Sequence, residues 1–214
     1  MTIYDGAIFD LDGTLIATES LAISSGYEAV ETFGQPCKPG LFESLVGKDD
    51  VTCAKVVAAT YGDAFPFIEF AGRWNMFFHQ KLDQGIPLRP GVLELLDLLA
   101  ARNMPCAVAT SSRRDSALKK LRLTDLDRYF DTVVTVDCIT NPKPAPDPFL
   151  EAARRLSLAP GRCIAFEDSD TGAAAARAAG MVVVQVPDMV PSTGPHAHHL
   201  ADSLMDGARL AGLI

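Results

Sequence analysis

The sequence alternates between short, nearly continuous apolar runs and longer segments in which apolar residues recur every three or four positions. The short runs are typical of strands buried on both faces of a parallel sheet, and the longer segments predict amphipathic helices. The expected strands are Ile3–Phe9, Pro105–Ala109, Val133–Val136, Cys163–Phe166 and Val182–Val186. The expected helices are Pro90–Arg102, Arg113–Leu123, Asp147–Leu156 and Thr171–Ala179. This alternation predicts an α/β fold in which helices flank a parallel sheet.

The region from about Leu21 to Leu82 departs from this alternation. It contains no convincing strand, and its three helical stretches are separated by glycines. The third stretch carries aromatic residues three and four positions apart: Phe67, Phe70, Trp74 and Phe77. Such a stripe indicates a packed helical core rather than a ligand site. We therefore expect a Rossmann-like α/β core domain of residues 1–16 and 85–214, with an inserted α-helical domain of residues 17–84.

The charge and cysteine content limit the possible partners and compartment. Lys and Arg number 19 against 27 Asp and Glu, which gives a net charge of −8. A protein that tracks nucleic acid or adheres to an anionic membrane needs a concentrated basic surface, so we expect neither partner. The cysteines are odd in number and widely spaced, and the first residues lack the pattern of a secretory signal. We expect a cytoplasmic monomer with free thiols.

Polar clusters directly follow the predicted strands, and the carboxyl ends of parallel strands are where such sheets bind ligands. Asp10 and Asp12 follow the first strand. Two residues apart in extended backbone, they start on one face, and Gly13 then permits a sharp turn. A carboxylate pair of this kind can bind Mg²⁺, or divide the roles of nucleophile and proton donor. A simple acidic turn is the alternative interpretation.

Three more clusters follow later strands. The sequence Thr110-Ser111-Ser112 precedes a helix, where hydroxyls and free N–H groups can cradle a phosphate or serve as ordinary N-caps. Lys143 lies between prolines, so a stiff loop presents its ammonium either to an anion or to solvent. Glu167 and Asp168 end the fourth strand and could complete a Mg²⁺ site with Asp10.

Two other groups of residues have simpler interpretations. Asp170 follows the fourth cluster and is expected to be an N-terminal cap of the next helix, or to interact with its dipole. The stretch His196-Ala197-His198-His199 lies in a Pro- and Gly-rich segment without the spacing of a strand or helix. We therefore expect surface histidines rather than a zinc site.

Together, the four clusters resemble the four motifs of the haloacid dehalogenase superfamily. The similarity is greatest to members like beta-phosphoglucomutase and the small sugar-phosphate phosphatases. It extends from Ile3 to about Pro187 and includes the helical insertion, which is similar to the mobile cap of that family. The resemblance implies a Mg²⁺-dependent phosphomonoesterase acting on a small phosphorylated metabolite, such as a sugar phosphate, phosphoglycolate or a nucleotide.

The resemblance also implies a role for each cluster. Asp10 would attack phosphorus to form an aspartyl-phosphate, while Asp12 would protonate the leaving oxygen and later deprotonate the hydrolytic water. The phosphoryl oxygens would be bound by Thr110, Ser111 and Lys143. The Mg²⁺ ligands would be the Asp10 carboxylate, the Asp12 backbone carbonyl, Asp168 and Glu167.

Two alternatives share most of these features. A phosphosugar mutase of the beta-phosphoglucomutase type often has His near position 22, where this chain has Ala22. A non-catalytic receiver-like phospho-acceptor domain also has a parallel sheet, an Asp, a Thr or Ser and a Lys. Its Asp lies on a central strand rather than the first, and it lacks a helical insertion. Within the insertion, Lys48 follows Gly47 and is either the candidate cation that contacts the substrate or an exposed surface lysine.

Overall fold

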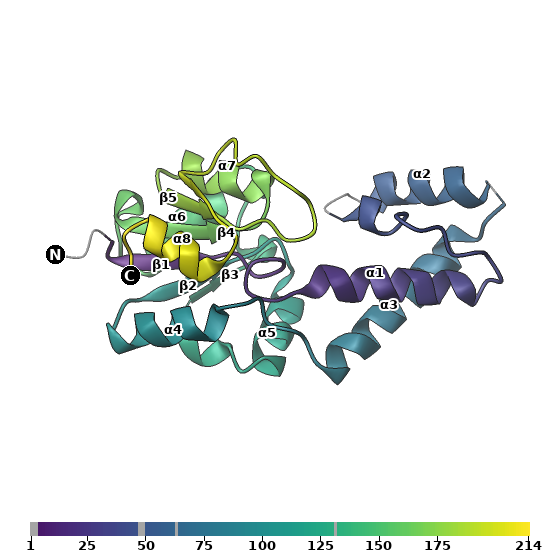
Figure 1. Cartoon of the computed structure of the whole chain (residues 1–214), viewed down its shortest axis with the longest axis horizontal. Coiled ribbons are helices and arrows are strands. Elements are labelled where there is room, and N and C mark those ends of the chain that lie inside the picture. The colour runs from purple at the N-terminus through teal and green to yellow at the C-terminus, as the bar shows by residue number, and fades with distance from the viewer. Residues whose placement is uncertain (1–3, 47–49, 63, 131) are drawn as a thin grey trace. The chain divides into compact units, whose positions relative to one another are not determined.

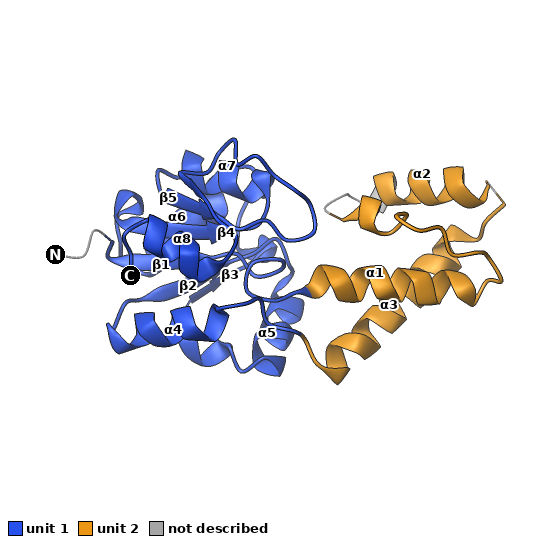
Figure 2. Ribbon diagram, in the orientation of Figure 1, with its two compact units in different colours: residues 1–17, 87–214 blue, residues 18–86 orange. Residues whose placement is uncertain are grey.

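The computed structural model describes residues 4–46, 50–62, 64–130 and 132–214. The chain forms two compact units (Figure 2). The first unit comprises residues 1–17 and 87–214, and the second comprises residues 18–86. The first unit contains a sheet with helices packed against it, and the second is helical (Figure 1).

The sheet confirms the predicted parallel α/β fold. Its strands are β1 (Gly6–Phe9), β2 (Cys106–Ala109), β3 (Thr132–Val134), β4 (Cys163–Glu167), β5 (Val182–Gln185) and β6 (His199–Leu200). They run parallel in the order β3-β2-β1-β4-β5-β6. The first strand in the chain therefore lies between β2 and β4, with Phe9 paired to both Val108 and Phe166. Strand position thus fails to separate this fold from a receiver-like domain, because the first strand is itself central.

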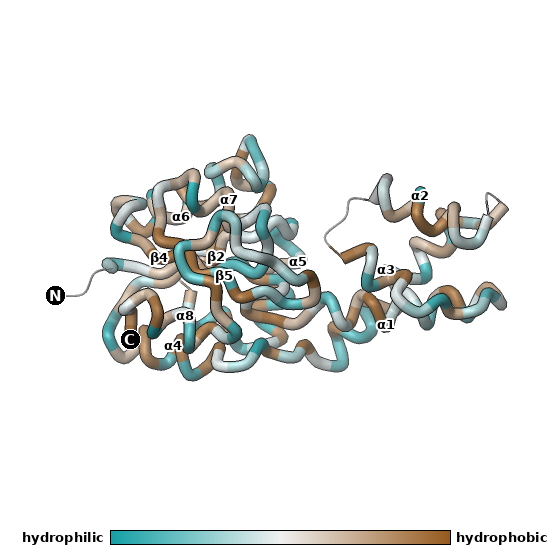
Figure 3. The backbone as a smooth tube through the Cα atoms, turned by 45° about the horizontal axis from the view of Figure 1, so that its top comes forward, coloured by the Kyte–Doolittle hydropathy of each residue, from teal (hydrophilic) through white to brown (hydrophobic). Residues whose placement is uncertain are grey.

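The five predicted strands form where apolar residues are continuous. All residues of β1, β2 and β4 are buried, which matches strands covered on both faces. Figure 3 colours the chain by hydropathy, with β2 and β4 labelled. The expectation that the stretch around His199 lacks a strand is wrong. His199 and Leu200 pair with β5 although neither is buried, so their pairing depends on the neighbouring strand rather than on a local apolar pattern.

Helices cover both faces of the sheet. One face is covered by α6 (Asp147–Arg155) and α7 (Asp170–Ala178), whose residues share a core with Val183 of β5. The opposite face is covered by α8 (Leu204–Leu210), because a Cβ added at Gly207 would lie 2.2 Å from Cγ1 of Val184, the next residue of β5. The remaining helices of this unit are α4 (Val92–Ala101), which contacts α8, and α5 (Arg114–Leu123).

The second unit consists of α1 (Thr18–Glu31), α2 (Asp50–Tyr61) and α3 (Phe67–Gln84), with a short 3-10 turn at Glu43–Leu45. Its core is aromatic, as the stripe on the third helical stretch predicts: Phe70 is fully buried, and Phe67, Trp74 and Phe77 pack against the same cluster. The indole of Trp74 also donates a 2.7 Å hydrogen bond to the Ala22 carbonyl of α1. No helix in the described ranges has the length and hydrophobicity needed to cross a membrane.

The chain leaves and re-enters the first unit through two paired backbone segments. The amide of Ala17 donates to the Pro87 carbonyl at 2.9 Å, and the amide of Arg89 donates to the Leu15 carbonyl at 3.0 Å. Between them, Ile16 and Leu88 form an antiparallel bridge. The outgoing and returning segments are therefore held side by side at the boundary of the first unit.

Candidate active site

The sheet brings three of the predicted clusters to one edge. Asp10 directly follows β1, and its amide donates to the Phe166 carbonyl of β4 at 2.9 Å. Thr110 directly follows β2, and its amide donates to the Val134 carbonyl of β3 at 2.9 Å. Glu167 is the last residue of β4. Because the strands are parallel and in register, their polar ends converge although they lie far apart in the sequence.

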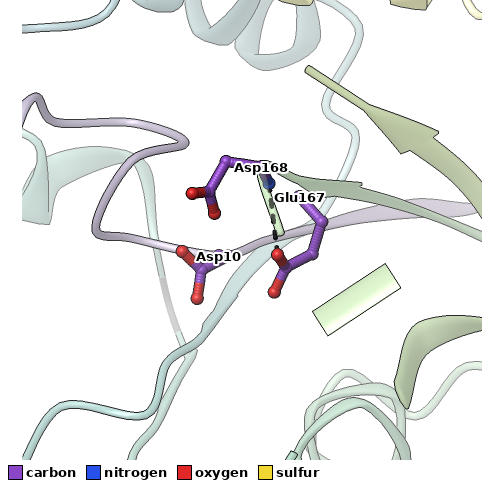
Figure 4. Close-up of side chains that lie close together, drawn as sticks. All are labelled: Asp10, Glu167 and Asp168. Atoms are coloured by element: carbon purple, nitrogen blue, oxygen red, sulfur yellow. Dashed lines mark hydrogen bonds between the residues drawn. The ribbon is translucent and has the colours of Figure 1, made fainter. Parts of the chain in front are cut away.

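Three carboxylates converge at this edge. One oxygen from each of Asp10, Glu167 and Asp168 lies within 4.8 Å of the other two, and the three side chains lie close together in Figure 4. Asp10 and Glu167 are buried, and Asp168 is half-buried and accepts a 3.3 Å hydrogen bond from the Thr14 hydroxyl. An all-oxygen set of anionic donors suits a hard divalent cation such as Mg²⁺. The residues present therefore fit a metal site.

Lys143 lies against the same group. Its ammonium donates to Oδ1 of Asp10 at 2.5 Å and to Oε1 of Glu167 at 2.6 Å. Only 5% of its side chain is exposed, and its Nζ lies 5.1 Å from the centre of the Phe149 ring. The alternative of a solvated lysine is therefore wrong. The proline-rich loop delivers the ammonium into the carboxylate group.

The charged side chains of this group shift one another's pKa values. Burial raises the pKa of Asp10 well above its ordinary value, and although Lys143 opposes the shift, Glu167 and Asp168 add to it. Burial alone would lower the pKa of Lys143, but the carboxylates of Asp10 and Glu167 outweigh it and raise that pKa. Lys143 is therefore a permanent cation near neutral pH. A second positive charge beside Asp168 would favour ionised Asp10 further.

Glu167 has protein partners at both oxygens. While Oε1 accepts from Lys143, Oε2 accepts from the Asp168 amide at 3.1 Å and from the amide and hydroxyl of Ser169 at 3.1 and 2.9 Å. Gly172 makes room for it, since a Cβ there would lie 1.7 Å from Oε1. This set of contacts fixes the carboxylate where it holds Lys143.

Asp170 lies in the first turn of α7, where an acidic side chain interacts favourably with the helix dipole, but the expectation that it caps the helix is wrong. Ser169, not Asp170, caps α7: its hydroxyl accepts from the Gly172 amide at 3.1 Å. The Asp170 carboxylate instead accepts hydrogen bonds from Gln185 at 2.8 Å and from the Ser192 hydroxyl. Asp170 therefore joins the end of β5 to the loop beyond it.

The Asp12 carboxylate has a different set of partners. Its Oδ1 accepts from the Lys120 ammonium at 2.7 Å, and its Oδ2 accepts from the Ser112 hydroxyl at 2.8 Å. Sequence reasoning missed Lys120, which lies on the buried face of α5 with Ala117 and Leu121. Its spacing from these two apolar residues was the available signal, because a lysine on an apolar stripe needs a buried partner.

Only part of the second cluster, residues 110–112, is buried at this edge of the sheet. Thr110 is buried, and its Oγ1 accepts from the Ser112 amide at 3.0 Å, whereas Ser111 is exposed. The alternative that these hydroxyls cap the next helix is wrong, because the N-cap of α5 is Arg113 and has no side-chain cap bond. Lys48 lies outside the described residues.

The histidine stretch confirms the surface prediction. His196 and His198 are exposed, and His199 is half-buried. Nδ1 of His198 accepts a 3.0 Å hydrogen bond from the Val183 amide. Within the described ranges, the carboxylate group of Figure 4 is the arrangement suited to a metal, and the histidines form no such group.

Comparison with known proteins places this geometry in a family. The model of the haloacid dehalogenase-like hydrolases matches residues 7–186. The phosphorylated carbohydrates phosphatase of Thermotoga maritima is 30% identical over 83% of this chain and 82% of its own length. The fructose-1-phosphate phosphatase YqaB of Escherichia coli is 33% identical over 86% of this chain and 96% of its own length.

A solved structure gives the same result. A Thermotoga maritima protein provisionally named a beta-phosphoglucomutase superposes with a TM-score of 0.85 at 26% identity, covering 98% of this chain and 99% of the other. The resemblance found in the four motifs is thereby confirmed. The chain belongs to the haloacid dehalogenase-like hydrolase family, and the two curated relatives named above are phosphatases.

Proposed function

We propose that this chain is a Mg²⁺-dependent phosphomonoesterase that hydrolyses a small organic phosphate through an aspartyl-phosphate on Asp10. One observation carries the proposal. The buried Asp10 carboxylate directly follows the interior strand β1, accepts a hydrogen bond from the Lys143 ammonium, and lies close to the carboxylates of Glu167 and Asp168 in a group that could hold a metal. Two phosphatases among the curated relatives support the reaction type.

The first step transfers the phosphoryl group to the protein. A carboxylate oxygen of Asp10 forms a bond to phosphorus as the bond from phosphorus to the ester oxygen breaks, and Asp12 gives its proton to the departing oxygen. Lys143 and the hydroxyl of Thr110 bind the phosphoryl oxygens, which accumulate charge in the transition state. Mg²⁺, held by Asp10, Asp168 and the Asp12 carbonyl, would supply further neutralisation of that charge.

The second step releases phosphate. Asp12, now ionised, takes a proton from water while the water oxygen attacks phosphorus, and the Asp10 carboxylate is regenerated. Glu167 supports both steps by holding Lys143 through its Oε1, because its Oε2 is occupied by three donors from the start of α7. We assign Glu167 to this positioning function in preference to direct metal binding.

The substrate is a small phosphorylated metabolite. Sugar phosphates are the class suggested by the relatives named for phosphorylated carbohydrates and fructose 1-phosphate. The helical unit of residues 18–86 would act as the cap that selects among them, with Lys48 as its predicted contact to the substrate anion. A cytoplasmic monomer remains our prediction for the chain.

Phosphate release from an aryl phosphate tests the proposal. The wild-type chain should turn over p-nitrophenyl phosphate with Mg²⁺ and stop when EDTA is added. Asp10→Asn should lose on the order of three to six powers of ten in rate. Asp5→Asn, which alters an aspartate paired with Arg162 on the surface, is the matched control and should stay within about twofold of wild type. Full activity of Asp10→Asn, or activity that survives EDTA, would refute the mechanism.

A panel of phosphometabolites separates the phosphatase from its alternatives. The proposal requires hydrolysis of at least one sugar phosphate to exceed isomerisation of any hexose 1-phosphate. Faster isomerisation would assign the chain to the phosphosugar mutases instead. A receiver-like domain would form a phospho-aspartate without catalytic turnover, so repeated turnover excludes that class.

A further inference from the structure

The Asp12 carboxylate contacts Lys120, which lies outside the four predicted clusters, and Ser112, which was expected to bind phosphate or cap a helix. Lys120 and Ser112 contact opposite oxygens of its carboxylate, and the Lys120 ammonium also donates to the Ser112 hydroxyl at 3.2 Å. These contacts close a triangle of three side chains from the β1 turn, the β2 loop and helix α5. The triangle is separate from the carboxylate group that surrounds Lys143.

We infer that Lys120 and Ser112 are positioning residues that fix the Asp12 carboxylate on the β2 side of the site and keep it out of the Asp10–Glu167–Asp168 group. The inference rests on the proposed function, in which Asp12 exchanges protons with the leaving group and with water. It assigns to α5 a part in the reaction that the four motifs do not include.

The burial of Lys120 indicates that its ammonium is held by an ion pair inside the protein. The residue is 6% exposed, and its neighbours on the same helical face, Ala117 and Leu121, are fully buried. An ammonium at such a position is strongly unfavourable unless it is paired, and an apolar side chain would satisfy helix packing equally well. The 2.7 Å contact with Asp12 is the pairing that compensates this burial.

The distribution of charges explains what the pairing achieves. Asp10 and Asp12 are two residues apart, and Lys143 already serves Asp10 and Glu167. Without a cation of its own, the Asp12 carboxylate would be drawn to the same ammonium, or to a metal bound by the acidic group. Lys120 supplies a second cation for the ionised Asp12 carboxylate, the form that takes a proton from water in the second step, so Asp10 and Asp12 each contact an ammonium of their own.

Ser112 connects this arrangement to the expected phosphoryl site. Its hydroxyl donates to Asp12, and its amide donates to Oγ1 of Thr110 at 3.0 Å. Thr110 therefore constrains the same short loop that orients Asp12. The proton donor and the phosphoryl-binding hydroxyl are fixed relative to each other by one residue.

Steady-state kinetics of α5 and loop variants test the inference. Lys120→Met should lower kcat for an aryl phosphate by on the order of 100-fold, with KM within about threefold, because substrate binding is intact while the proton donor is misplaced. Ser112→Ala should lower kcat by roughly tenfold, and Lys120→Arg, which keeps the charge, should recover most of the loss. Lys119→Met, the same change at the preceding residue of α5, is the control and should behave as wild type.

A double-mutant comparison distinguishes positioning from general damage. In an Asp12→Asn chain there is no carboxylate to hold, so adding Lys120→Met should change the residual rate by less than about twofold. A further loss as large as that in the wild-type background would mean that Lys120 is merely structural and would overturn the inference. If Lys120→Met does not fold, Ser112→Ala and Lys120→Arg provide the same comparison with Asp12→Asn.

The remaining outcomes are also decisive. A wild-type chain that hydrolyses phosphomonoesters while Lys120→Met retains full kcat refutes this inference and leaves the proposed function standing. A wild-type chain that hydrolyses none refutes both.

Discussion

A methyl group added at Gly172 should displace the Glu167 carboxylate and so disrupt the group of charges around Lys143. It is the third residue of α7, and a Cβ there would lie 1.7 Å from Oε1 of Glu167 and 1.9 Å from its Cδ. Contacts of Cβ atoms below 3.0 Å are essentially never seen, so the carboxylate would have to retreat by at least 3.0 − 1.7 = 1.3 Å. Gly172→Ala should therefore displace Glu167 from Lys143 and from the donors at the start of α7.

The size of the effect follows from what Glu167 loses. Its carboxylate is 1% exposed and accepts hydrogen bonds from Lys143, the Asp168 amide and both donors of Ser169. Disrupting a buried ion pair typically costs about 3 to 5 kcal/mol. Replacing a helical glycine by alanine returns about 1 kcal/mol. We expect a net loss of about 2 to 4 kcal/mol, or a fall of roughly 5 to 15 °C in Tm.

Thermal unfolding and aryl phosphate turnover measure the two consequences. Besides the lower Tm, kcat should fall by on the order of 100-fold, because Lys143 loses the partner that orients it. Gly72→Ala is the matched control: it lies in helix α3, and nothing comes within 4 Å of an added Cβ. It should raise stability by up to about 1 kcal/mol with unchanged kcat. Equal stability and activity of the Gly172→Ala and Gly72→Ala chains would refute this account of Glu167.

Three further predictions concern other parts of the chain. Lys143→Met leaves two buried carboxylates uncompensated, so urea unfolding should show a loss of about 3 to 5 kcal/mol; an unchanged midpoint would contradict the burial argument. Although His198 is exposed as a whole, its ring is partly desolvated where Nδ1 meets the Val183 amide, and this desolvation, with the nearby charge of Arg177, lowers its pKa. The unfolded chain therefore binds the proton more tightly, and stability should fall as the pH drops below about 6.5. The variant His198→Asn, which can still accept from the Val183 amide, should show a smaller fall in Tm between pH 7.5 and 5. Burial raises the pKa of Cys163 to about 11, so a thiol reagent at pH 8 should label the exposed Cys37 before it. Early labelling of Cys163 in the folded chain would instead show that β4 opens readily.

The elements with a strong local pattern could be predicted from the sequence. Strands β1, β2, β4 and β5 are continuous apolar runs, and their predicted positions differ from the observed ones only near the ends. Strand β6 and helix α8 were not predicted. His199 and Leu200 form a strand because β5 offers an open edge, and α8 has only seven residues, so neither carries enough local periodicity to be recognised.

The candidate site divides in the same way. The ends of β1, β2 and β4 could be predicted to converge, because parallel strands place their carboxyl ends at one edge. The partners of each side chain could not. Lys143 proved buried and Lys120 entered from a helix face, since which cation reaches which carboxylate depends on packing between elements distant in sequence.

The paired segments at Ala17 and Pro87 have a consequence for how such a chain can change over time. Because the helical unit departs and returns at hydrogen-bonded neighbours, its removal would leave two ends that a tight turn could join. The sheet and its carboxylates need no part of the inserted sequence to complete their own backbone pairing. The insertion point therefore allows the inserted unit to be exchanged without altering the sheet, and under the proposed function such an exchange would present the same site residues to different substrates.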